Sequence, residues 1–273
     1  MGDQPSSRYC IVNKGLIWRP LISAPEVMMN YTRALGVSNY LEFQDIFSTE
    51  DWILEMIESK VISVLLVFPL TEGFREFRLV NQKCSDPMTC EIYKLVDNNE
   101  LWFMKQVVGN ACGQIALFHS ILNNRENLHL KEGSLAHKLA AVNGPSAADI
   151  RGNMLKTDPE FSTTHDMVIS CCDQDLNDNE EYKEVDTHYV VFVDVNGDLY
   201  EFDGQLPHPI KHGKINGNLL KSAVKVIKHN FLDHFLGGKE SRFAILAMCL
   251  GQSEEINVEK LDKVEQAEEV EVS

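Results

Sequence analysis

The sequence has no apolar run that approaches the ~18–20 residues needed to span a bilayer, so we expect no integral membrane segment. It also has no excess of basic charge, because 25 Lys and Arg face 41 Asp and Glu and the formal net charge is −16. Nucleic-acid binding depends on Lys and Arg clustered against phosphates, so this balance argues against a nucleic-acid partner. The first residues, MGDQPSSRYC, lack the basic and apolar regions of a signal peptide.

The cysteines show neither a disulfide framework nor the paired CxxC spacing of a zinc site. Their number is odd, which leaves at least one thiol unpaired. We therefore expect no metal and no other cofactor. Together with the missing signal peptide, the pattern predicts a reducing, cytoplasmic location. The seven cysteines are residues 10, 84, 90, 112, 171, 172 and 249.

The chain does contain enough apolar residues, 44%, to build a sizeable core, and its length allows one large domain or two small ones. The acidic excess is concentrated in two segments. Residues 173–186 carry seven acids and one Lys, and residues 254–273 carry eight acids and two Lys, a net charge of −6 each. Both segments are typical of solvated, mobile chain.

Apolar periodicity and turn signals predict an α+β chain. The motif SAAD at residues 146–149 is a capping box and predicts a helix start. The longest irregular stretch spans residues 157–186, and connections of that length inside a domain are usually functional or disordered. The expected helices span residues 25–36, 51–59, 112–122, 146–155 and 219–235, and the expected strands span 61–68, 101–107, 188–195, 199–203 and 242–250.

A hairpin turn at Asn196-Gly197 joins two strands and is the most informative local feature. A two-residue turn pairs Val195 with Asp198, which puts His188 and Asp203 on one face of the sheet as diagonal neighbours. A carboxylate beside an imidazole fixes its tautomer and steadies the imidazolium. The hairpin alone favours the simpler alternative, in which both side chains point at water from an exposed sheet face.

A second candidate cluster combines Gln106 with Cys112. A cysteine at the start of a helix lies near the positive end of the helix dipole, which favours the thiolate. Gln106, six positions earlier at the end of the expected strand, could donate to an oxyanion beside the backbone N–H of Cys112. Taken alone, this pattern also fits a small buried cysteine in a helix packed against a strand.

Taken together, the two clusters predict a thiol peptidase, because the chain order Gln, Cys, His, Asp is that of papain-like peptidases. Two stretches closely resemble the ubiquitin C-terminal hydrolase family of cysteine deubiquitinases: FMKQVVGNACGQIALFHSILNN and VDTHYVVFVDVNGDLYEFDGQLPHPIKHG. The stretches IWRPLISAPEVM and VISVLLVFPLTEGFREF also resemble segments of that family.

The resemblance implies a role for each member of the tetrad. Cys112 matches the nucleophile, His188 the general base and acid, Asp203 the residue that orients the histidine, and Gln106 the oxyanion donor. It also implies a papain-like cysteine peptidase fold with a central antiparallel sheet flanked by helices, a knotted chain path, and a crossover loop over the cleft at residues 157–186. The catalytic domain would span residues 16–250, between a flexible leader at 1–15 and an acidic, flexible or weakly helical tail at 251–273.

The implied reaction is thiol-dependent hydrolysis at the C-terminal glycine of ubiquitin, with small or unfolded leaving groups and ubiquitin as partner. Two alternatives stay open: a preference for the ubiquitin-like modifier NEDD8, and a non-catalytic module that binds ubiquitin. We expect a monomer. Other conspicuous residues have simpler explanations, since His119 fits a packed histidine and neither His165 nor the Cys171-Cys172 pair belongs to a motif.

Overall fold

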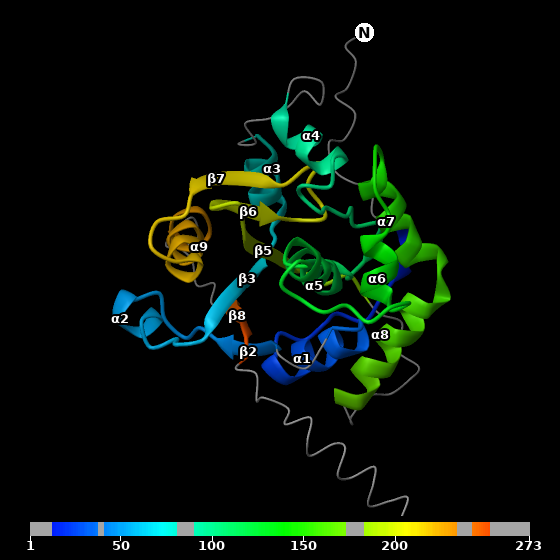
Figure 1. Ribbon diagram of the computed structural model, residues 1–273, viewed down its shortest axis with the longest axis horizontal. Helices are drawn as coiled ribbons and strands as arrows, with labels where there is room; N and C mark the ends of the chain where they lie inside the picture. The colour runs from blue at the N-terminus through cyan, green and yellow to red at the C-terminus, as the bar shows by residue number, and fades with distance from the viewer. Residues whose placement is uncertain (1–12, 38–40, 81–89, 173–182, 234–241, 252–273) are drawn as a thin grey trace, which may run out of the picture.

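The structure is a computed structural model that describes residues 13–37, 41–80, 90–172, 183–233 and 242–251. A six-stranded antiparallel sheet in the order β2-β8-β3-β5-β6-β7 runs through its centre (Figure 1). The expected central antiparallel sheet is therefore confirmed. Its strands are β2 (Leu41–Asp45), β3 (Lys60–Pro69), β5 (Thr187–Val195), β6 (Asp198–Phe202), β7 (Ile210–Lys214) and β8 (Ala244–Leu250).

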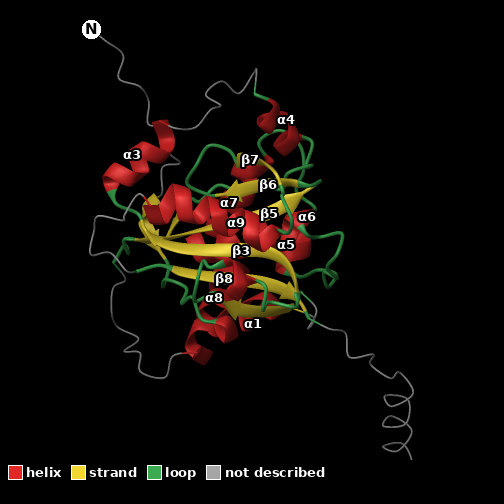
Figure 2. Cartoon of the chain, turned by 90° about the vertical axis from the view of Figure 1, so that its left-hand side faces the viewer, coloured by secondary structure: helices red, strands yellow, loops and turns green. Residues whose placement is uncertain are grey.

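Helices cover both faces of this sheet (Figures 1 and 2). On one face lie α1 (Pro25–Ala34), α5 (Cys112–Asn123), α6 (Leu135–Ala140), α7 (Ala147–Thr157) and α8 (Pro159–Cys172). On the other lie α2 (Asp51–Leu54), α3 (Glu72–Val80) and α9 (Leu219–Ile227), which continues as a π-helical turn at Lys228–Leu232. The short helix α4 (Glu91–Asp97) precedes α5 in the chain.

Strand β3 is central because its sequence, KVISVLLVFP, is apolar on both faces. It pairs with β5 on one side and β8 on the other, and alternate side chains enter two separate cores. Leu65 and Val67 belong to the core under α5, whereas Val64 and Leu66 belong to the core under α9. The buried strand expected at residues 61–68 is therefore confirmed.

The β5–β6 hairpin has the predicted register, with Val195 opposite Asp198 and Val191 opposite Phe202. Its turn residues Asn196 and Gly197 have φ values of +56° and +78°, as a primed two-residue turn requires. The expectation of an exposed sheet face is wrong, because α9 and the turn after it cover the face that carries Val190.

The strand expected at residues 101–107 is also wrong. Only Val108–Gly109 form a strand, β4, which pairs in parallel with β1 (Asn13–Ile17). The backbone N–H groups of the residues before β4 bond to separate side chains and carbonyls instead of to a neighbouring strand. Trp102 N–H donates to Asn123 Oδ1 at 2.9 Å, Met104 N–H to His119 Nε2 at 3.1 Å, and Gln106 N–H to the carbonyl of Gly204 at 2.8 Å.

The segment expected to be irregular, 157–186, is helical over α8. Phe161, His165, Val168 and Ile169 of α8 are buried with helical spacing, and Asp158 Oδ1 accepts from Glu160 N–H at 3.0 Å at its start. Residues 173–182, the middle of the expected crossover loop, lie outside the described residues. So do most of the expected leader and tail, and the knotted path stays a prediction.

Several smaller expectations are corrected. The helix expected at 51–59 is the single turn α2, and the capping box is absent because Ser146 has a φ of +65° and its side chain makes no cap bond, although α7 starts where expected. Cys112, Cys171 and Cys249 are free thiols, whereas Cys90 is disulfide-bonded, which the sequence pattern did not predict.

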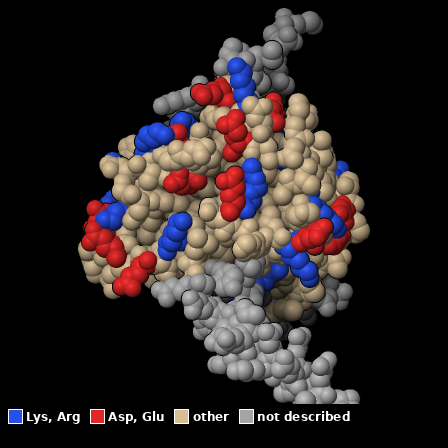
Figure 3. All heavy atoms as spheres, viewed as in Figure 1, with Lys and Arg blue, Asp and Glu red and all other residues tan. Residues whose placement is uncertain are grey.

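No helix among the described residues is long and apolar enough to cross a membrane. On the face shown in Figure 3, acidic and basic side chains are interspersed and do not gather into a patch of one sign.

Candidate active site

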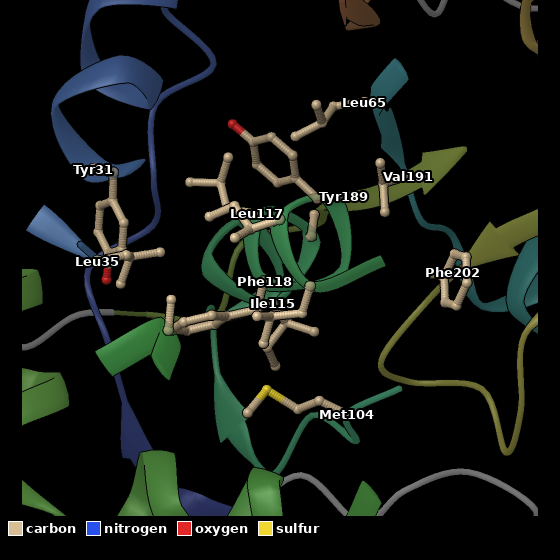
Figure 4. Close-up of a cluster of buried hydrophobic side chains, with 14 of the residues drawn as sticks. Tyr31, Leu35, Leu65, Met104, Ile115, Leu117, Phe118, Tyr189, Val191 and Phe202 are labelled. Atoms are coloured by element: carbon tan, nitrogen blue, oxygen red, sulfur yellow. The ribbon is translucent and has the colours of Figure 1, made fainter. Parts of the chain in front are cut away.

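Cys112 is the first residue of α5, a helix whose side chains are buried on every side from Cys112 to Leu122. Figure 4 shows why: Ile115, Leu117 and Phe118 point into side chains from the sheet, from α1 and from the segment around Met104. A helix that is surrounded on every side by packed side chains has a fixed position in the core. The nucleophile candidate therefore sits at the N-terminus of a fully buried helix.

Gly113 permits a close approach at this helix start. A Cβ atom built there would lie 2.9 Å from Leu21 Cβ and 3.3 Å from the Tyr189 ring. Tyr189 also donates its hydroxyl to the carbonyl of Leu21 at 2.9 Å. The glycine after Cys112 therefore lets the segment around Leu21 pack against α5 and β5, a constraint that the sequence pattern did not indicate.

His188 lies near the start of β5, opposite Phe68 of β3, and is buried. Its Nε2 is 2.7 Å from Asp203 Oδ1, and it lines the same cleft as Cys112, whose proximity contributes to raising the pKa of His188. Since Nε2 faces the carboxylate, Nδ1 is the nitrogen left for the sulfur. The predicted juxtaposition of His188 and Asp203 is confirmed, and Cys112 joins them.

Asp203 directly follows β6 and uses both carboxylate oxygens. Oδ1 accepts from His188 and from the backbone N–H of Gln205 at 2.9 Å, and Oδ2 is 3.0 Å from Arg78 Nη1. Arg78, on α3, also pairs with Glu201 and lies over the rings of Phe68 and Phe231. The candidate catalytic carboxylate is therefore held from both sides.

These contacts determine the charges of the site. Burial by itself lowers the pKa of His188, but the charge and hydrogen bond of Asp203 and the bond to Cys112 outweigh it and raise the pKa to about 9. Burial by itself raises the pKa of Asp203, but the positive charges of His188 and Arg78 hold it well below its ordinary value. At neutral pH the site therefore holds an imidazolium against a carboxylate.

Gln106 is buried beside the same helix start. Its Nε2 donates to the carbonyl of Val108 at 3.1 Å, and its Oε1 has no hydrogen-bond partner. A glutamine amide has two N–H donors, so one remains for another acceptor. Gly204 makes the position possible, because a Cβ there would lie 2.9 Å from Ile115 Cγ2 and 3.2 Å from both N and Cβ of Gln106.

One polar cleft of about 100 Å³ brings the candidates together. Gln106, Cys112 and His188 line it, while Asp203 stands behind His188. The acidic side chains of Glu184 and Asp186 form part of its wall. Its other lining residues are Leu70, Arg75, Asn110, Val185, Thr187 and Gln205.

Sequence reasoning missed two residues of this site. Arg78 is buried one helical turn after Phe74, and a charged residue on the apolar stripe of α3 was a usable signal. Asn110 is buried with a φ of +58°, and its side chain makes three hydrogen bonds. The Gly109-Asn110 break was visible in the sequence, but the bonding partners of Asn110 were not.

The other histidines that the sequence singled out are structural. His119 stacks on Phe103, accepts from Met104 N–H, and is buried so deeply that its pKa is lowered to about 3. His165 lies in α8, stacks on Trp18, and has a pKa lowered by burial to about 4. Among the described residues, no group of three or more His, Cys, Asp or Glu side chains could hold a metal ion.

Comparison with protein families gives one match that covers most of the chain. The model of the family described as "Ubiquitin carboxyl-terminal hydrolase, family 1" matches residues 18–232. Ubiquitin carboxyl-terminal hydrolase 3 of Arabidopsis thaliana is 34% identical over 213 residues, which are 77% of this chain and 86% of the relative. A probable ubiquitin carboxyl-terminal hydrolase of Dictyostelium discoideum is 33% identical over 239 residues, 87% of this chain and 90% of the relative.

Comparison with solved structures supports the fold. The crystal structure of the Trichinella spiralis UCH37 catalytic domain bound to ubiquitin vinyl methyl ester aligns with a TM-score of 0.64 and 20% identity. The alignment covers 87% of this chain and 99% of that domain. At this identity the likeness shows the fold, and it bears out the expected architecture of a sheet flanked by helices.

Proposed function

This chain belongs to family 1 of the ubiquitin carboxyl-terminal hydrolases, and we propose that it is a cysteine deubiquitinase in which Cys112, His188, Asp203 and Gln106 carry out the reaction. One observation carries the assignment of residues: His188 is hydrogen-bonded to Asp203 and lines one cleft together with Cys112 and Gln106. A thiol, an imidazole and an orienting carboxylate gathered at one cleft are the parts that a cysteine peptidase needs.

In the acylation step, the sulfur of Cys112 attacks the carbonyl carbon of the C-terminal glycine of ubiquitin. The protonated His188 faces that sulfur and stabilises its negative charge. The carbonyl oxygen becomes an oxyanion, for which Gln106 Nε2 and the backbone N–H of Cys112 at the start of α5 are the candidate donors. The C–N bond then breaks, His188 gives its proton to the leaving amine, and a thioester remains on Cys112.

In the deacylation step, neutral His188 takes a proton from water, and the hydroxide formed attacks the thioester carbon. The carbon–sulfur bond breaks, ubiquitin leaves as a carboxylic acid that gives its proton to solvent, and Cys112 returns as a thiolate beside protonated His188. Asp203 stays ionised throughout, since Arg78 and His188 hold its pKa low. Its task is to orient the ring and to balance the imidazolium charge.

We propose ubiquitin as the protein partner, with small or unfolded groups as the leaving side. The acidic wall residues Glu184 and Asp186 suit the arginine-bearing C-terminal tail that family resemblance implies for ubiquitin. NEDD8 is the competing partner, and parallel hydrolysis of C-terminal fluorogenic amides of ubiquitin and NEDD8 distinguishes the two. We further propose a cytoplasmic monomer; the free thiols of Cys171 and Cys249 support a reducing compartment, whereas the disulfide at Cys90 does not.

The test of the assignment compares two thiols. Cys112→Ala is expected to lower kcat/KM for a ubiquitin C-terminal amide to background, a loss of at least about 10⁴-fold, because the nucleophile is removed. Cys171, a free and exposed thiol on α8, provides the control, and Cys171→Ala is expected to retain the parent rate.

An electrophilic ubiquitin probe followed by peptide mapping gives the second readout. It should modify Cys112 in the parent and leave the Cys112→Ala variant unlabelled. Turnover that survives in Cys112→Ala would contradict the assignment. Ubiquitin binding by the parent without any turnover would favour the non-catalytic alternative.

A further inference from the structure

Asn110 adopts a backbone conformation that an asparagine tolerates less readily than glycine. Its φ of +58° lies in the left-handed region, two residues before Cys112. Glycine enters this region without strain, and strained residues at a functional site are held there by their surroundings. Since the turn itself requires only glycine, the side chain of Asn110 is the feature that needs an explanation.

The side chain of Asn110 uses its full set of amide groups. Nδ2 donates to the carbonyl of Trp18 and to the carbonyl of Lys183, both at 3.0 Å. Oδ1 accepts from the backbone N–H of Val185 at 3.1 Å. One buried amide thus bonds to two segments that are more than 160 residues apart in the chain.

These two segments flank the nucleophile. Trp18 belongs to the chain that follows β1, and its N–H donates to the carbonyl of Gly109 at 3.0 Å. Residues 184–187 line the cleft beside Cys112 and lead into β5, which carries His188. Asn110 lines the same cleft.

The second segment is held at its other end as well. The carbonyl of Asp186 accepts from Leu70 N–H at 2.7 Å, and its carboxylate pairs with Arg242 at 2.7 Å. Asp186 is thus tied to β3 and to the chain before β8, while Lys183 and Val185 are tied to Asn110. Without Asn110, the described bonds of this wall on the side of Cys112 would be lost.

We propose that Asn110 is a positioning residue that holds the Trp18 segment and the 183–185 segment at a fixed distance from Cys112, and so determines how tightly the cleft binds the extended C-terminal peptide of its substrate. This inference rests on the proposed function and names a determinant of its substrate affinity. Asn110 acts through the two segments that it holds and not by contact with the reacting atoms. Its effect belongs to substrate binding rather than to the chemical step.

The experiment uses two variants and one matched control in the full chain. Asn110→Gly keeps the left-handed backbone and removes all three bonds, while Asn110→Asp keeps the acceptor for Val185 and replaces the donor to Trp18 and Lys183. Asn196→Gly is the control, because Asn196 has a φ of +56° in the hairpin turn far from the cleft. Steady-state hydrolysis of a ubiquitin C-terminal amide gives kcat and KM, and amide hydrogen exchange reports on the Val185 N–H.

For Asn110→Gly, KM is expected to rise about tenfold and kcat to fall less than about threefold, since several hydrogen bonds to the walls are lost but the Cys112–His188 contact remains. The Val185 N–H should exchange at least about tenfold faster. In Asn110→Asp, KM should also rise, while Val185 keeps its protection. Asn196→Gly should match the parent in both measurements.

The proposal would be overturned by an unchanged KM, by unchanged exchange at Val185 in Asn110→Gly, or by a loss confined to kcat. Alkylation of Cys112 by iodoacetamide should stay within about twofold of the parent, and a larger change would place Asn110 in the support of the thiol instead. Global unfolding of both variants would also overturn it. A parent chain without ubiquitin hydrolysis would refute the proposed function, while the exchange measurement would still test the role of Asn110.

Discussion

At the scale of single residues, the site depends on a balance of buried charges. Arg78 contacts two carboxylates, Asp203 and Glu201, and Glu201 also pairs with His212 Nε2 at 2.9 Å. A buried charge is costly unless it is paired and hydrogen-bonded. Because Arg78 occupies one oxygen of Asp203, the other stays directed at His188. The charge state of His188, the proposed catalytic imidazole, therefore depends on a guanidinium that does not line the cleft.

The raised pKa of His188 leads to a prediction about pH. The imidazolium is present below a pH of about 9 and is lost above it, so kcat/KM should fall on the alkaline side near pH 9. Asp203→Asn removes the charge that raises this pKa and should move the alkaline limb toward the ordinary histidine value of about 6.5. We also expect kcat to fall by about 10²–10⁴, since the ring loses its orienting partner.

The measurement is a profile of kcat/KM from pH 5 to 10 with a ubiquitin C-terminal amide. Asp198→Asn is the control, because Asp198 pairs with Lys211 and Lys214 at the hairpin and should leave the profile unchanged. An alkaline limb that stays in place in Asp203→Asn would contradict the assignment.

The raised pKa of His188 also stabilises the fold. This contribution to the free energy of unfolding is fully present below the pKa of histidine in the unfolded chain and is lost as pH rises through about 9.

At the scale of elements, the site exists because the ends of one helix and two strands meet: the start of α5, the start of β5 and the end of β6. Helix α5 packs on β5, so its N-terminal Cys112 comes beside His188 near the first residue of that strand. Strand β6 ends where Asp203 reaches the same imidazole. The turn after Asp203 accepts a bond from Gln106, because the carbonyl of Gly204 receives its N–H. The turn at Gly204 therefore joins the acid and the oxyanion donor.

That turn leads to a second prediction. Gly204→Ala should destabilise the fold by about 1–3 kcal/mol, because the new methyl group would press on Ile115 and on Gln106 in a packed region. It should also lower kcat, since Gln106 is displaced. Urea unfolding and steady-state kinetics measure the two effects. Gly73→Ala in α3 is the control, because no atom lies within 4 Å of a Cβ there, and it should retain parent kinetics and stability or gain up to about 1 kcal/mol.

If Gly204→Ala has the same free energy of unfolding as the parent, the side chains around residue 204 shift to accept the methyl group more easily than the distances imply. Parent kcat with reduced stability would separate the packing of the turn from the position of Gln106 and weaken the proposed oxyanion role.

The elements also show how much the sequence could predict. The strand at 61–68, the helix at 112–122 and the hairpin register were predictable because each depends on a local pattern, namely an apolar run, a buried helix after Gly109-Asn110, or a primed turn. The segment 101–107 was not, because its backbone bonds go to side chains and carbonyls distant in the chain. Helix α8 was missed because polar residues interrupt its buried stripe.

The same division holds for the site. His188 and Asp203 could be placed together from the register alone, and the family resemblance supplied the partnership with Cys112 and Gln106. The contacts of Arg78 and Asn110 could not be predicted, because each joins segments that only the tertiary fold brings together.

At the scale of the whole molecule, the negative charge is unevenly placed. Two acidic segments, 173–186 and 254–273, carry a net charge of −6 each out of −16. On the face of the described structure in Figure 3, charges of both signs are mixed. The candidate tetrad lies between residues 106 and 203, so none of its members belongs to the last twenty residues.

This leads to a prediction about the C-terminal segment. A chain that ends at Gly251 should keep kcat and KM for a small ubiquitin amide within about twofold at physiological salt, where charges beyond about 8 Å are largely screened. The ionic-strength dependence of kcat/KM between low and physiological salt should become weaker. A control chain with neutral Gln and Asn in place of the acids of 254–273 should behave in the same way. Loss of turnover in a folded truncated protein would contradict this expectation.

The position of β8 has a consequence for how the protein is made. This strand, Ala244–Leu250, is the last of the strands that the structure describes, yet it pairs with both β2 and β3 and separates them in the sheet. A growing chain emerges from the ribosome with β2 and β3 already available and the strand between them still missing. The sheet on which α5 rests is therefore completed only after residue 250 has been synthesised. A nascent chain stalled before residue 244 would hold all four members of the candidate tetrad and still lack the pairings of β8 with β2 and β3.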